Sequence, residues 1–151
     1  MEPLIIRRSF AVALLALGLM SATGCSPTTR ISYIPEGGTY TADELAGVLE
    51  ATDADDLAGM PADEVGEARQ EALSDLRTHG EAAAALADAL TTQFPIDVNS
   101  VPIEVRMATY EGAPAWIVVE SWGEAGQPLS SRRLWVFSSE SLELITALSQ
   151  Q

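Results

Sequence analysis

The side chain that the sequence best places for acid–base chemistry is Glu120, which lies between Trp116 and Trp122. A carboxyl group between tryptophans loses hydration, which raises its pKa toward the range that a general acid requires. Glycosidase-type catalysis also needs a second carboxylate at a defined separation, and the sequence names none. Because Glu120 comes near a strand end, solvent exposure or pairing with Arg132 or Arg133 is favoured. We therefore assign no catalytic residue.

Other candidate bases and ligands are sparse. His79 is the only histidine, and it directly precedes Gly80, where a helix terminus favours a cation. Residues 53–64 echo the spacing of a calcium loop, yet Ala58 stands where that loop needs glycine. No Gly-x-Ser-x-Gly motif supports nucleophilic chemistry. We expect neither a metal nor a cofactor, and interpret the acidic stretch as a solvated linker.

The N-terminal residues predict an export signal. Arg7 and Arg8 precede an uncharged apolar run at 10–20, and small residues follow it, which is the order of a secretory signal peptide. The run is about 11 residues long, whereas a membrane-spanning helix needs about 20, so a removable leader is favoured. The two arginines also resemble a twin-arginine export signal, although Ile6 precedes them where that signal has a polar residue. The export route therefore stays open.

The residues Ala22-Thr23-Gly24-Cys25 resemble the lipobox of bacterial lipoproteins. The resemblance implies cleavage between Gly24 and Cys25 and a diacylated Cys25 thiol, which would hold the protein on the extracytoplasmic face of the cell membrane. Ala22 departs from the large aliphatic residue usual at its position. The alternative is an ordinary signal peptide cut elsewhere, which would leave Cys25 as a free thiol.

Charge excludes several partners. Removing Glu2, Arg7 and Arg8 from the 22 acids and 8 bases leaves 21 acids and 6 arginines, a net charge of about −15. Such a domain is repelled by nucleic acid and by anionic lipid. The lone cysteine excludes an intramolecular disulfide, so stability must come from packing.

We expect three regions: a signal peptide at 1–24, a lipidated N-terminus and flexible tether at 25–40, and one α+β domain at 41–151. Thr41 and Glu44 form a capping-box pattern at a first short helix. Two amphipathic helices follow, at about 61–79 and 81–94, and they form either an αα-hairpin or a single helix kinked at Gly80.

The composition then changes to alternating β-branched and aromatic residues, which predicts three or four antiparallel strands in a meander. The expected fold is α+β, with the helices packed on one face of this sheet. A hairpin turning at 111–114 places Val105, Met107, Trp116 and Val118 on the helix-facing side. Glu120 shares that side unless a register slip or bulge turns it to solvent.

Aromatic side chains on strands usually pack in the core or in cross-strand pairs, which we favour for Trp116, Trp122 and Trp135. Tyr110 and Trp122 lie near strand ends. They are therefore the better candidates for an exposed binding surface.

Residues 81–147 resemble PepSY-type domains, small α+β modules of bacterial envelope proteins. In these modules a helix precedes an antiparallel meander, and the last hairpin often reads strand, Asp-x-x-Thr-Gly-Glu, strand. Here Leu134-Trp135-Val136-Phe137 is followed by Ser138-Ser139-Glu140-Ser141-Leu142-Glu143, which lacks the Asp and the Gly. The resemblance implies the helix-and-meander fold expected above. Such modules are associated with peptidase inhibition or localised protein interaction.

The sequence thus favours a membrane-anchored envelope lipoprotein with a non-enzymatic domain that binds a protein or peptide. The final strand could accept an extended partner by strand addition. The alternative is a small-ligand carrier or an enzyme with a pocket between helices and sheet.

Overall fold

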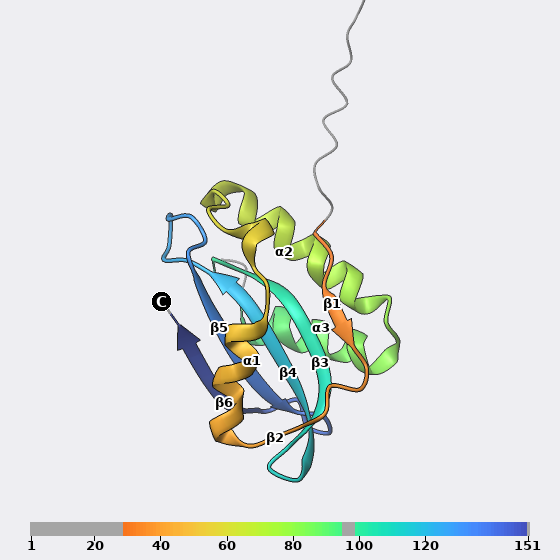
Figure 1. The fold of residues 1–151 in the computed structure, drawn as a ribbon. Coiled ribbons are helices and arrows are strands. Elements are labelled where there is room, and N and C mark those ends of the chain that lie inside the picture. The colour runs from red at the N-terminus through yellow and green to blue at the C-terminus, as the bar shows by residue number, and fades with distance from the viewer. Residues whose placement is uncertain (1–28, 95–98, 151) are drawn as a thin grey trace, which may run out of the picture.

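The computed structural model describes residues 29–94 and 99–150, and it shows an α+β fold with one mixed sheet between two helical layers (Figure 1). The predicted fold class is confirmed. In chain order the elements are β1 (Ser32–Ile34), β2 (Thr39–Tyr40), the 3-10 helix η1 (Ala42–Glu44), α1 (Leu45–Ala51), the 3-10 helix η2 (Asp55–Leu57), α2 (Ala62–Arg77), α3 (Glu81–Gln93), β3 (Ser100–Tyr110), β4 (Ala113–Trp122), β5 (Ser131–Ser138) and β6 (Leu144–Gln150).

The sheet contains the predicted antiparallel meander, β3-β4-β5-β6, and two further strands. β1 and β2 both pair in parallel with β3. The tether expected at 25–40 is therefore corrected: residues 29–40 belong to the domain, and residues 25–28 lie outside the described residues. Short strands among Pro and Gly residues carry no period-two signal, which is why the sequence indicated a tether.

The β3–β4 hairpin places Val105, Met107, Trp116 and Val118 on one side of the sheet, as predicted, although its turn is 111–112 where 111–114 was expected. Val105 pairs with Val118 and Met107 with Trp116, around a two-residue turn at Glu111 and Gly112. Both turn residues have positive φ, at 49° and 84°, as the right-handed twist of a tight hairpin demands. The one irregularity of this pairing falls between Pro102 and Glu104, on the opposite strand from Glu120.

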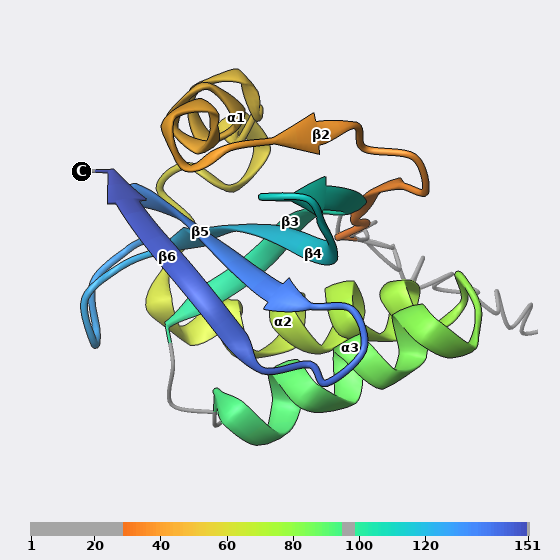
Figure 2. The same ribbon diagram turned by 90° about the horizontal axis from the view of Figure 1, so that it is seen from below.

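The helices cover both faces of the sheet, which corrects the expectation of a single helical face (Figure 2). α2 and α3 pack against the side of Val105, Trp116 and Val118, while α1 packs against the side of Ile117 and Val119. Since β4 is apolar on both sides, each side needs its own cover.

Of the two arrangements left open at Gly80, the structure has the αα-hairpin. Gly80 has φ 111°, which ends one helix and redirects the chain before the next. Across the hairpin, Arg77 Nη2 lies 2.9 Å from Asp88 Oδ1 on the outer surface.

Candidate functional site

Glu120 is fully buried, on the side of the sheet that faces α2 and α3. Its Oε1 accepts a hydrogen bond of 3.1 Å from Arg69 Nη1. Its Oε2 accepts bonds of 2.8 Å from Arg133 Nε and 2.9 Å from Trp135 Nε1. Both carboxylate oxygens are therefore occupied by protein donors. The predicted pairing with Arg133 is present, whereas the predicted solvent exposure is not.

The same arginines tie several elements together. Arg69 comes from α2 and also donates to the Ser100 oxygens at the start of β3 and to Leu90 O near the end of α3. Arg133 Nη2 donates to Ser100 Oγ. A carboxylate that is fully buried and has both oxygens bound by protein donors is closed to a substrate. We assign this cluster a structural role.

Arg69 was not among the predicted site residues, although the sequence carries a signal for it. On α2 it lies between the buried residues Val65 and Leu73, four positions from each. A charged residue within the apolar stripe of a helix needs a buried partner of opposite charge. Glu120, expected on the same side of the sheet, is the partner that this rule asks for.

A second charged cluster lies on the α1 side of the sheet. Arg106 binds the carboxylate of Glu104 and donates to the Tyr40 hydroxyl at 2.7 Å. Glu104 also accepts a bond of 3.4 Å from Thr52 Oγ1. Thr52 O in turn accepts a bond of 2.6 Å from Arg132 Nη1. These contacts fix the segment between α1 and η2 over the sheet.

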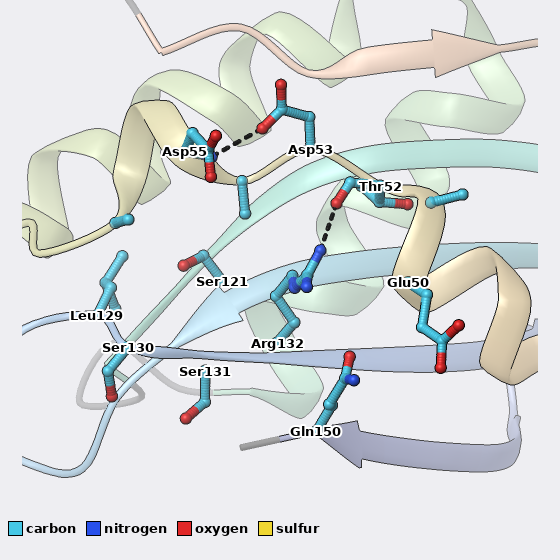
Figure 3. Close-up of a pocket in the computed structure, with 13 residues that line it drawn as sticks. Glu50, Thr52, Asp53, Asp55, Ser121, Leu129, Ser130, Ser131, Arg132 and Gln150 are labelled. Carbon is cyan, nitrogen blue, oxygen red and sulfur yellow. Dashed lines mark hydrogen bonds between the residues drawn. The ribbon is translucent and has the colours of Figure 1, made fainter.

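That segment forms one wall of a hollow of about 490 Å³ (Figure 3). Arg132 reaches across its floor toward Thr52, and Asp53 Oδ1 accepts a 2.9 Å bond from the backbone N–H of Asp55. The polar lining residues are Glu50, Thr52, Asp53, Asp55, Ser121, Ser130, Ser131, Arg132 and Gln150. Hydroxyls, carboxylates and one guanidinium could hold a small polar ligand, but the lining contains no histidine or cysteine to act as base or nucleophile.

Tyr110 and Trp122, the two predicted surface residues, differ in how far they are buried. Tyr110 is only 9% exposed and packs in the core under α1, so it forms no exposed surface. Trp122 is partly buried and lines a hollow of about 700 Å³ beside the β4–β5 loop. The Arg133 guanidinium lies 5.6 Å from its ring centroid. Trp116 is core, as predicted.

β6 is the edge strand of the sheet beside β5. Its sequence, Leu-Ile-Thr-Ala-Leu-Ser-Gln, contains no charge and no proline. Leu144 is 45% exposed and Ile145 is 48% exposed, and both lie at its start. Edge strands are commonly protected from pairing by charges, proline or shortness, and β6 has none of these.

His79 and the acidic residues at 53–64 make local packing contacts and hydrogen bonds within the fold. The His79 ring stacks on Tyr33 at 4.3 Å, and its Nε2 lies 3.9 Å from Asp75 Oδ2. Within residues 29–94 and 99–150, no group of three or more His, Cys, Asp or Glu side chains could hold a metal ion.

Gly24 and Cys25, the predicted cleavage and lipidation residues, lie outside the described residues. In the part of the chain that the structure describes, no helix is both long and apolar enough to cross a membrane.

Comparisons with known proteins do not add a relative: no family model matches the chain, and no curated protein or solved structure matches it either. The lipobox and PepSY resemblances therefore stay predictions from the sequence.

Proposed function

We propose that this protein is an envelope lipoprotein, anchored through Cys25 to the extracytoplasmic face of the cell membrane. Its domain binds an extended segment of another envelope protein along the free edge of β6, and it performs no catalysis. The observation that carries the proposal is the unprotected character of that edge.

Strand addition fits the chemistry of β6. An added strand would gain main-chain hydrogen bonds, which do not depend on the partner's side chains, and Leu144 and Ile145 would lose their contact with water. The opposite edge of the sheet offers fewer main-chain hydrogen bonds to an added strand, because β1 and β2 have only three and two residues. A neutral edge also avoids the repulsion that the acidic remainder of the surface exerts on anionic segments.

A second candidate function rests on the polar hollow around Arg132. Its volume of about 490 Å³ suits a small polar ligand. Glu50→Gln, which alters the hollow and leaves β6 intact, would weaken such a ligand but not a strand-adding partner.

Site-specific photo-cross-linking in living cells tests the β6 proposal. A photoreactive residue at the exposed position Ala147 should capture one recurring protein partner, and Ile145→Lys in the same chain should abolish the product, because an edge lysine opposes strand addition. Ala85→Lys is the matched control, since it adds the same charge to the exposed face of α3. A product that persists with Ile145→Lys, or disappears equally with Ala85→Lys, contradicts the proposal.

A further inference from the structure

The segment that leads toward the proposed anchor is fastened to α2. Glu71 Oε2 accepts a hydrogen bond of 3.0 Å from the backbone N–H of Thr29, and Asp75 Oδ2 accepts one of 3.0 Å from the N–H of Ile31. Each bond has a charged acceptor, which makes it stronger than a bond between neutral groups. The two carboxylates are four residues apart on α2, so they share one face of the helix.

Packing reinforces these bonds. The Ile31 side chain is only 6% exposed and belongs to the core beneath α2 and α3. Two residues later, Tyr33 stacks on His79 with an interplanar angle of 15°. β1 then pairs with β3 from Ser32 to Ile34. The chain is thus held to the domain from Thr29 onward, and we call this attachment the N-terminal latch.

We infer that the latch holds the domain against the lipid bilayer, with the end at which β1 begins facing the headgroups. This inference rests on the proposed lipidation of Cys25. Cys25 and Thr29 are separated by four residue steps, which span about 14 Å at most in an extended chain. The acyl chains lie in the bilayer, so Thr29 must lie within about that distance of the surface.

The fold then decides which parts approach the lipid. In Figure 1 the chain leaves the domain at the end where β1 starts, and the β3–β4 turn lies at the opposite end. A hollow of about 470 Å³ at the first end is lined by Thr29, Arg30, Asp53, Asp56 and neighbouring residues. β3 has 11 residues and runs between the two ends, so the turn lies farther from the bilayer, by up to about 35 Å.

The partner surface is the headgroup layer, and charge does not bring the domain to it. Asp53 and Asp56 flank the hollow and are repelled by anionic lipid, and Arg30 supplies a single opposing charge. The short chain and the latch therefore set the distance. Contact is expected on zwitterionic phosphatidylcholine vesicles as well as on anionic ones.

Energy transfer to the membrane tests this orientation in the lipidated, full-length protein. Lipidation consumes the only native thiol, so an introduced cysteine can be labelled uniquely. Asp56→Cys marks the end near the anchor and Ala113→Cys marks the far turn, and both positions are exposed. With an acceptor on phosphatidylcholine headgroups, the donor at 56 should transfer strongly. The donor at 113 should lie farther out, by up to about 35 Å, and should transfer more weakly. Equal transfer from both positions, or stronger transfer from 113, overturns the inference.

Proteolysis tests the latch itself. Arg30 lies between Thr29 and Ile31, so trypsin can separate domain from anchor there only when the latch opens. In vesicle-bound protein, Glu71→Gln together with Asp75→Asn should speed release of the 31–151 fragment by about tenfold or more. Glu67→Gln is the control, because it removes an exposed charge from the same helix. Equal release rates for the latch variant and the control overturn the latch.

The experiments distinguish a failure of the proposed lipidation from a failure of the inferred orientation. A protein without lipid would not sediment with the vesicles, and mass spectrometry of the peptide ending at Arg30 would show an unmodified Cys25. A lipidated protein with equal transfer at 56 and 113 would instead retain the anchor and refute only the orientation.

Discussion

At the scale of single residues, the most consequential group is the Glu120 carboxylate. Three donors from α2 and β5 converge on it: Arg69, Arg133 and Trp135. Arg133 also lies over the Trp135 ring, 4.8 Å from its centroid. Two guanidinium groups held near one another are tolerable because this carboxylate lies between them. A buried cluster of this kind contributes little net stability but penalises any arrangement that leaves a charge unpaired.

The first prediction concerns that penalty. Glu120→Gln keeps the shape of the side chain and removes its charge, leaving the buried Arg69 and the partly buried Arg133 without a counter-charge. We expect the free energy of unfolding to fall by about 3–5 kcal/mol, measured by urea denaturation. Glu124→Gln, in the exposed β4–β5 loop, should change it by less than about 0.5 kcal/mol. An unchanged free energy of unfolding in Glu120→Gln would show that Arg69 and Arg133 do not depend on the charge of Glu120.

At the scale of elements, α1 is the shortest α-helix in the described part of the chain, and it continues directly from the 3-10 helix η1. The predicted capping box is present: Glu44 Oε2 accepts bonds from the Thr41 N–H at 2.8 Å and from the Thr41 hydroxyl at 2.9 Å. These bonds lower the pKa of Glu44, the backbone bond contributing most. α1 covers one side of the sheet, so its start affects that side's core.

The second prediction follows from this shift. A folded-state pKa below the unfolded value adds stability above the unfolded pKa, and this stability is lost as pH falls through the folded pKa. NMR titration should find that Glu44 ionises at a lower pH in the folded protein than in the same protein unfolded in urea. Thr41→Val should move the Glu44 pKa upward, because it removes the hydroxyl donor. An unchanged Glu44 titration in that variant would mean that the hydroxyl contributes nothing.

At the scale of the whole molecule, the surface carries many acidic side chains and few cations. Arg69, Arg77, Arg106 and Arg133 each contact a carboxylate, and three of these four pairs are largely buried. Few cations are left to offset the remaining surface acids. The folded state therefore concentrates like charges, and their repulsion opposes compaction.

The third prediction is that salt stabilises the domain. Raising potassium chloride from about 0.01 M to about 0.5 M shortens the screening length severalfold, so the melting temperature should rise by several degrees. Glu67→Lys should raise the melting temperature at low salt and reduce the salt effect. A melting temperature that falls with salt would mean that attractive pairs, not repulsion, dominate.

The sequence by itself determined what local patterns encode. Period-two alternation predicted which residues of β3 and β4 share a side of the sheet, including the helix-facing side of Glu120, and the capping residues located the start of the first helix. The position of Arg69 within the apolar stripe of α2 indicated that it needs a buried partner, but the contact with Glu120 itself is formed only in the folded chain, where residues 51 positions apart meet. The sequence also could not reveal β1 and β2, because both short strands pair in parallel with β3, and the residues just before β1 are held by carboxylates of α2. The tertiary structure alone decided these features, since their stabilising contacts join residues that no sequence period connects.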